Sequence, residues 1–243
     1  HQFIIQPIMP LTVAGFDISF TNSSLWMLIG ALLSIVVLGL SASRQAMVPS
    51  RLQMVGESLY GFISNLISDN IGGNAKQYFP LVFTVFMMVL VGNMLGMVPY
   101  SFTYTSHLAV TGGLALMVFF TVLIMGIGRH GLHFFQLFVP PGVPLWLIWL
   151  VILIEIVSFI SRPITLSVRL FANMVAGHVL MKVIAGFAIL FATAGGLAWL
   201  GTIIPVLLNV VMVGFEFFIA FIQAYVFAVL TCIYLKDTME IDH

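Results

Sequence analysis

Long apolar segments alternate with short polar connections along this chain. A helix needs about 20 apolar residues to cross about 30 Å of hydrocarbon, and five segments are long enough to do so. They cover residues 25–42, 79–98, 110–128, 145–193 and 201–235. The pattern predicts an all-α integral membrane protein with about five membrane crossings.

Residues 43–78 form the most polar internal stretch and contain a second pattern. Apolar side chains recur there at intervals typical of one helix face: Leu52, Val55, Leu59, Phe62, Ile63, Leu66 and Ile67. Two interpretations stay open, an amphipathic helix on the membrane surface and a packed cytoplasmic helix. The sequence Gly72-Gly73-Asn74 is expected to end this helix.

The last two apolar segments are too long to cross the bilayer upright. At 1.5 Å per residue they would reach about 70 Å and 50 Å, so each must tilt strongly or bend, and Pro163 is the expected bend. Gly195-Gly196 lies between them, which predicts a long tilted hairpin. No internal repeat is present, so the inverted repeats of many secondary transporters lack support.

The chain is expected to divide into three parts. Residues 1–24 form an outer N-terminal segment, and residues 25–144 hold three spans, the amphipathic segment and an inner loop at 129–144. Residues 145–243 form the tilted hairpin. Basic residues occur only in alternate connections, which places the N-terminus outside and the C-terminus on the cytoplasmic or matrix side. These residues are Arg44, Arg51, Lys76, Arg129 and Lys236.

Composition agrees with lipid as the solvent and excludes several other classes. Hydrophobic residues make up 61% of the 243 residues and charged residues 7%, against about 45–50% and about 25% in soluble domains. The net charge of zero excludes a nucleic-acid binder. The single cysteine, Cys232, excludes a disulfide framework, a four-cysteine zinc site and an iron–sulfur cage, and no cofactor is expected.

Ionisable and amide side chains gather in the two long segments, although each charge at the centre of a membrane helix costs about 2.5–3.5 kcal/mol. The first segment contains Glu155, Arg162, Arg169, Asn173, His178 and Lys182. The second contains Asn209, Glu216, Gln223 and Asp237. Buried charge at this density predicts a function within the membrane.

Folding the two segments as an antiparallel hairpin about Gly196 predicts three polar layers. They pair His178 with Glu216, Arg169 with Gln223, and Glu155 with Asp237. Arg169 lies roughly 13 Å from the outer layer and roughly 20 Å from the inner one along the helix. The predicted orientation places the histidine layer towards the outside.

The layers suggest a proton path in two halves. Histidine and carboxylates exchange protons near neutral pH, whereas arginine keeps its charge. A fixed cation would separate the two halves and favour the ionised form of a nearby carboxylate. No acid of this chain is expected level with Arg169, so the matching carboxylate is expected on another chain.

Structural alternatives stay open for single residues. Arg169 could pair with Glu155 or Glu216, and His178 could be a satisfied core histidine. Lys182 is expected to extend to the outer interface. Further expectations are that Arg162 anchors the inner half, that Glu155 and Asp237 are hydrated or line a channel mouth, and that His107, His130 and His133 are solvated.

The run Arg-Leu-Phe-Ala-Asn-Met-Val-Ala-Gly-His at 169–178 resembles the signature of subunit a of F-type ATP synthases. Glu155 precedes that arginine by fourteen residues, and Glu216 and Gln223 stand seven apart, as in that family. Further similar stretches lie at 20–24, 71–74, 99–103 and 129–134. The resemblance covers nearly the whole chain.

The resemblance implies a stator subunit that faces a rotating ring of c subunits. Arg169 would be the proton translocation gate and would interact with each ring carboxylate as it passes. By the same resemblance, the outer half-channel holds His178 and Glu216, the inner one Glu155 and Asp237, and the polar neighbours of the arginine are Asn173 and Gln223. The implied partners are the c-subunit ring, peripheral-stalk b-type subunits, the remaining synthase subunits, membrane lipid and protons, with no nucleic acid.

The expected function is therefore proton translocation in a rotary ATP synthase, without catalytic residues in this chain, because it contains no glycine-rich phosphate loop. The histidine-before-glutamate order resembles mitochondrial and alphaproteobacterial relatives, so a bacterial plasma membrane and a mitochondrial inner membrane both stay open. The alternative is a stand-alone proton-coupled transporter, which would show discontinuous helices and a solute pocket. A haem or quinone subunit would need facing histidines at membrane depth.

Overall fold

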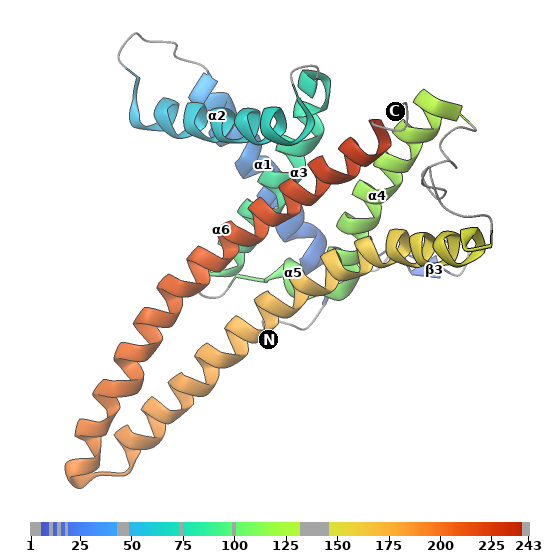
Figure 1. Cartoon of the computed structure of the whole chain (residues 1–243). Coiled ribbons are helices and arrows are strands. Elements are labelled where there is room, and N and C mark those ends of the chain that lie inside the picture. The colour runs from blue at the N-terminus through green and yellow to red at the C-terminus, as the bar shows by residue number, and fades with distance from the viewer. Residues whose placement is uncertain are drawn as a thin grey trace.

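The computed structural model describes residues 6–9, 12–13, 16–17, 19–42, 49–72, 75–98, 101–131 and 146–239. Its long helices are α1 (Asn22–Ala42), α2 (Arg51–Ile71), α3 (Phe79–Gly96), α4 (Leu108–His130), α5 (Ile148–Thr193) and α6 (Ile203–Met239). Short 3₁₀ helices are η1 (Ala75–Tyr78), η2 (Tyr104–Ser106) and η4 (Gly196–Thr202). Figure 1 shows these helices and the long pair that ends the chain.

Five helices of the described part are long and apolar enough to cross a membrane, which confirms the all-α membrane fold. These spans are Asn22–Ala42, Lys76–Gly96, Leu108–Gly128, Ile148–Thr193 and Trp199–Thr238. Each begins within a few residues of its predicted position. A run of about 20 apolar side chains has few other stable arrangements in lipid, because the backbone must satisfy its own hydrogen bonds there.

Helix α3 lies at the centre of the packing. Its side chains Val82, Phe86 and Val89 are fully buried, and it contacts α1, α2 and α6. A helix that is apolar on all sides is typically enclosed by others. Pro80 lies in its first turn, where a missing backbone N–H removes no intrahelical hydrogen bond.

The predicted hairpin consists of α5, with 46 residues, and α6, with 37 residues. The two helices run side by side and point away from the rest of the molecule at their connected ends (Figure 1). Gly195 occupies the turn with φ 72°, a conformation that strongly favours glycine. Helix α5 continues through Pro163, and its yellow first part runs in a different direction from its orange remainder.

Helix α2 is the predicted amphipathic helix, and it lies across the end of the molecule that also holds the end of α6 (Figure 1). Ile63, Leu66 and Ile67 are buried against the core, whereas Leu52 and Val55 are exposed. One half of the apolar stripe therefore packs on the protein and the other half faces outward. The choice between a membrane-surface and a cytoplasmic setting stays a prediction.

The ends of α2 follow local sequence signals. Ser50 accepts a hydrogen bond from the backbone N–H of Gln53 and caps the first turn. Gly72 follows the last turn with φ 97°, so this glycine ends the helix as predicted.

The N-terminal part contains short strands that were not predicted. Strand β1 (Pro7–Met9) pairs antiparallel with β4 (Phe20–Thr21), and β2 (Thr12–Val13) pairs with β3 (Phe16–Asp17). Strands this short give no recognisable alternation in sequence. Arg44, His133 and most of the predicted inner loop at 129–144 lie outside the described residues.

Candidate functional site

Two buried ionisable side chains face each other between α5 and α6. Nε2 of His178 lies 3.9 Å from Oε1 of Glu216, and the side chains are 6% and 4% exposed. This pair matches the predicted outer layer. Gly177 permits the approach, because a Cβ at this position would lie 2.6 Å from Glu216 Oε1.

The connection between α3 and α4 supplies a third member of this group. Thr103 Oγ1 lies 3.3 Å from His178 Nε2 and donates a hydrogen bond to the carbonyl of Gly96 at 3.0 Å. A hydroxyl has one proton, so Thr103 accepts a hydrogen bond from Nε2–H of the histidine. The contact holds the imidazole ring in place in the tautomer that carries a proton on Nε2.

The same connection is rich in buried hydroxyl groups. Ser101, Thr103, Thr105 and Ser106 are all buried, and the sequence Ser-Phe-Thr-Tyr-Thr-Ser that contains them lies between two apolar spans. Thr103 itself was not predicted as a site residue. This run of hydroxyl residues was the signal that could have indicated it.

Both carboxylate oxygens of Glu216 are buried and accept no hydrogen bond within the described part of the chain. Leaving a buried polar group without a partner costs about 1–3 kcal/mol. The Glu216 carboxyl group is therefore poised for a further partner, and a water or a transferred proton has the right chemistry.

Arg169 lies on α5 with its side chain exposed on the outside of the chain. No hydrogen bond or ion pair joins its guanidinium to any residue described here, so neither Glu155 nor Glu216 neutralises it. Within the described residues, the structure shows no ion pair for this arginine of the kind that the structural alternative requires. The charge therefore faces outward from the described part of the chain.

The polar neighbours of Arg169 form a direct contact. Nδ2 of Asn173 donates a hydrogen bond to Oε1 of Gln223 at 3.0 Å, across the hairpin. The predicted register placed Gln223 level with Arg169, so this part of the prediction is wrong by about one helical turn. The position of the turn is the physical reason, because α5 ends at Thr193 and α6 begins at Ile203, so the connection is centred near residue 198 and not at Gly196.

The predicted inner layer is joined by Arg162. Its Nη1 lies 2.7 Å from Asp237 Oδ2, and its Nη2 lies 3.9 Å from Glu155 Oε1. The guanidinium also lies over the rings of Tyr234 and Phe159, at 5.3 Å and 6.0 Å from their centroids. Asp237 is therefore closest to Arg162 and not to Glu155, so the register prediction is also shifted here.

Of the other polar residues named from the sequence, Lys182 lies one helical turn from His178 and interacts with it electrostatically. Lys182 is exposed on α5, and the buried Oδ1 of Asn209 accepts no hydrogen bond in the described part. His107 was expected in solvent, but its ring stacks on Phe102 at 5.2 Å. Burial lowers the pKa of His107. Within the described ranges, no three metal-ligating side chains gather at one point.

Three polar groups thus follow one another along the hairpin. His178 and Arg169 are separated by nine residues, or about 13 Å of helix, and Arg169 and Arg162 by seven residues, or about 10 Å. The first and last of these groups, around His178 and around Arg162, contain side chains that can exchange protons. The middle group contains the guanidinium of Arg169, which cannot exchange protons and has no ion-pair partner among the described residues. Chemically, such an arrangement can accept protons at two levels without joining them directly.

Comparisons with known proteins place the whole chain. Residues 24–236 match the family model described as ATP synthase A chain. An ATP synthase subunit a from Parvibaculum lavamentivorans is 49% identical over 243 residues, which cover 100% of this chain and 94% of the relative. Another from Rhizobium etli is 51% identical over 240 residues, covering 99% and 96%. One from Rhodospirillum rubrum is 48% identical over 240 residues, covering 99% and 97%.

Proposed function

We propose a two-part proton path for this chain, which belongs to the ATP synthase A chain family. The chain is a multi-pass protein of an energy-coupling membrane, translocates protons as part of an ATP synthase and associates with its other subunits. The path consists of an outer half-channel, a fixed cation and an inner half-channel along α5 and α6. Each proton that crosses 100 mV releases about 2.3 kcal/mol, so ATP synthesis needs several protons per nucleotide.

The observation that carries the proposal is the exposed guanidinium of Arg169, which has no partner in the described chain. An uncompensated cation in hydrocarbon is expensive, and it attracts an ionised carboxylate. A carboxylate on the c-subunit ring is the partner that this position suits. Arg169 would release the proton of each carboxylate as it passes and would prevent direct leakage between the two halves.

The outer half-channel consists of His178 and Glu216, with Thr103 as a positioning residue. The 3.9 Å between Nε2 and Oε1 is longer than a hydrogen bond, and a bridging water or a small side-chain rotation would close it. Histidine exchanges protons near neutral pH. This pair would deliver protons from the outer side to the ring.

The inner half-channel consists of Glu155 and Asp237, held together by Arg162. The contact at 2.7 Å joins α5 to α6, and the more distant Glu155 stays 3.9 Å from the same guanidinium. The two carboxylates are about one-third exposed, so water from the inner side would reach them. Protons that leave the ring would pass to these acids.

The Asn173–Gln223 hydrogen bond supports the hairpin next to the gate. It lies four residues, about one helical turn, from Arg169. Its amides carry no charge at any physiological pH, so they supply polarity without taking up or releasing protons. The pair would maintain the separation of the helices while the ring carboxylate passes.

The orientation and the wider assembly extend the proposal. The N-terminus lies outside and the C-terminus inside, and α2 lies on the inner side together with the end of α6. Residues 145–243 carry the path, residues 25–144 support it, and residues 1–24 form an outer segment. Besides the c ring, peripheral-stalk b-type subunits would hold this stator in place. The bacterial origin of its relatives favours a bacterial plasma membrane.

The test is Arg169→Ala in the complete ATP synthase, reconstituted into vesicles. We expect ATP-driven proton pumping to be lost, because nothing would discharge the ring carboxylate. The matched control is Arg51→Ala, which removes an exposed arginine from α2 and should leave pumping unchanged. Coupled pumping that persists in the Arg169→Ala complex would refute the gate.

A stand-alone transporter makes a different prediction for vesicles that contain this chain alone. It would move protons together with a solute when this chain is reconstituted alone. The two half-channels proposed here exchange protons only with the c ring, so the isolated chain should not couple proton movement to the transport of a solute. Solute-coupled proton uptake by the chain alone would favour the transporter.

A further inference from the structure

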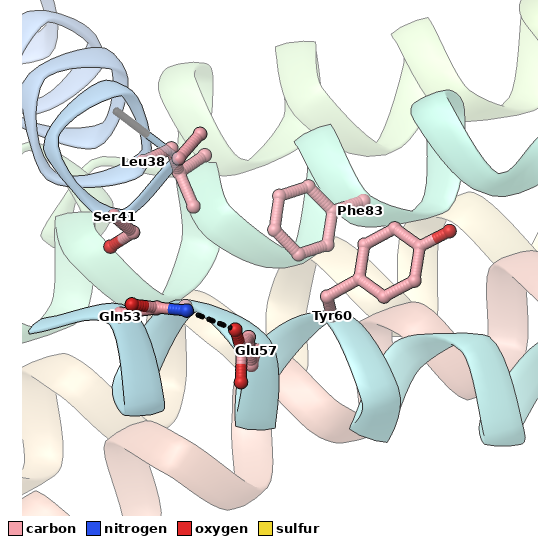
Figure 2. A pocket seen from close by; sticks show the side chains of 8 residues that line it. Leu38, Ser41, Gln53, Glu57, Tyr60 and Phe83 are labelled. Carbon is pink, nitrogen blue, oxygen red and sulfur yellow. Dashed lines mark hydrogen bonds between the residues drawn. The ribbon is translucent and has the colours of Figure 1, made fainter. Parts of the chain in front are cut away.

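A pocket that the proton path does not use lies between the end of α1, the first half of α2 and the beginning of α3 (Figure 2). Its volume is about 400 Å³, within the range of about 300–1,000 Å³ that small-ligand pockets occupy. The side chains that shape it are those of Leu38, Ser41, Gln53, Glu57, Tyr60 and Phe83.

One end of the pocket presents hydrogen-bond acceptors. Gln53 Nε2 donates to Glu57 Oε1 at 2.8 Å, the dashed line in Figure 2, and this contact orients the carboxylate. Ser41 Oγ directs its proton to the carbonyls of Val37 and Leu52, at 2.8 Å and 3.0 Å. The hydroxyl therefore offers only lone pairs to a ligand.

Gln53 adds another acceptor to the pocket, and this acceptor lacks a hydrogen-bond donor in the described part of the chain. Its side chain is 8% exposed, and its Oε1 is buried without a hydrogen bond in the described part of the chain. In Figure 2 this oxygen points away from Glu57 and towards Ser41. A buried acceptor of this kind is unusual in proteins, and a small shift of the amide would let a bound donor satisfy it.

The rest of the pocket is apolar and aromatic. Leu38, Tyr60 and Phe83 form its wall, and Phe79 lies 4.5 Å from the Tyr60 ring and 5.2 Å from the Phe83 ring. Aromatic faces attract cations. Among the described residues that line the pocket, the one charged group is the carboxylate of Glu57, so this lining suits a cation with an apolar remainder.

The position of the pocket indicates where such a ligand comes from. Helices α1 and α3 are membrane spans, and α1 ends at Ala42 in the same region where α3 begins at Phe79. The pocket therefore lies at the depth of lipid head groups. Ile35 lies one helical turn before Leu38 on the same side of α1 and is exposed, so it continues the apolar wall towards the hydrocarbon.

We propose that this pocket binds an aminolipid, with its primary ammonium at Glu57 and Ser41 and an acyl chain along the apolar wall. An ammonium group with three N–H donors complements a site made of acceptors. A choline head group has the charge but no N–H donor, and an anionic head group would be repelled by Glu57. A lysine of another protein has the same ammonium, but the open apolar wall favours a lipid.

The test measures lipids retained by the purified full chain in native mass spectrometry. Phosphatidylethanolamine, phosphatidylcholine and phosphatidylglycerol with identical acyl chains are added one at a time. We expect the ethanolamine lipid to bind best and Glu57→Gln to weaken it about tenfold, since a charged hydrogen-bond partner is lost. The matched control is Asp69→Asn, an exposed acid on the same helix that does not line the pocket.

A second variant separates loss of the site from loss of the fold. Leu38→Trp fills the apolar part and keeps Glu57, so it should also abolish ethanolamine-lipid binding while the helical circular dichroism is retained. Equal binding of ethanolamine and choline lipids by the natural chain would overturn the proposal. So would equal effects of Glu57→Gln and Asp69→Asn, or a density map of the complete synthase with a basic side chain of another subunit at Glu57.

Discussion

At the residue scale, one hydroxyl group determines how the outer histidine is held. Thr103 gives its proton to the Gly96 carbonyl and so receives Nε2–H of His178. The ring then lies at a fixed distance from Glu216. A side chain that never carries a charge thereby controls the geometry of two side chains that do.

Thr103→Val keeps the shape of the side chain and removes the hydroxyl. A neutral hydrogen bond contributes about 0.5–1.5 kcal/mol, so we expect proton uptake from the outer side to slow about two- to tenfold. The rate of proton-driven ATP synthesis in vesicles measures it. Thr103→Ser restores the hydroxyl and should recover most of the rate; equal rates for the serine and valine variants would contradict the positioning role.

Sequence alone could predict the charged residues of the site better than their partners. His178 and Glu216 followed from a hairpin about a glycine turn, because both belong to one continuous pair of helices. Thr103 lies 75 residues from His178, and no helical periodicity connects a loop to a helix so far away. Its partner could be found only from the packed structure.

At the element scale, α5 and α6 are joined by polar contacts at three levels. These are His178–Glu216, Asn173–Gln223 and Arg162–Asp237. The partners depart further from the predicted register towards the ends of the hairpin that lie far from its turn. A register counted from Gly196 places the turn about two residues too early, because the connection between Thr193 and Ile203 is centred near residue 198. In addition, Pro163 interrupts the backbone hydrogen bonds of α5 before the Arg162 contact.

Arg162→Gln tests the innermost contact. Partly exposed ion pairs contribute about 0.2–1 kcal/mol, so the complex should assemble, and we expect ATP synthesis to fall about two- to fivefold as Asp237 and Glu155 lose their shared partner. Synthesis in inverted vesicles is the measurement. Arg162→Lys keeps the charge and should retain more activity than the glutamine variant; the reverse order would argue against an ionic role.

Helix prediction succeeded for the spans and failed for the short strands, for a physical reason. A membrane span needs a long apolar run and leaves a strong signal. Strands β1–β4 have two or three residues each, so their pairing depends on contacts between segments and not on local pattern. For the same reason the helix α2 was predicted, but its packing on α1, α3 and α6 was not.

At the scale of the whole molecule, the two ends of the bundle differ. Helix α2 and the end of α6 lie together at one end, and the turn of the hairpin lies at the other (Figure 1). The basic residues Arg51, Lys76 and Lys236 lie in or beside the elements of the first end. This asymmetry agrees with the proposed orientation, because basic residues stay on the inner side of a membrane.

Labelling with a membrane-impermeant maleimide checks the orientation. Cys232 is buried and can be removed as Cys232→Ser to give a clean background. We expect Gln6→Cys to be labelled from outside and Ser50→Cys only from inside, in vesicles of known sidedness. Labelling of both positions from the same side would reject the proposed orientation.

The hairpin has a consequence for how the molecule settles in its membrane. Between the turn and the His178–Glu216 pair, the two helices expose four large apolar side chains: Ile189, Leu190, Ile204 and Leu207. This half of the hairpin is therefore stabilised chiefly by the packing of α5 against α6. These exposed positions leave the tilt of this half unconstrained by the other described helices. The tilt of the hairpin therefore depends on its surroundings. Bilayer thickness and neighbouring subunits will change this tilt more readily than substitutions within the chain.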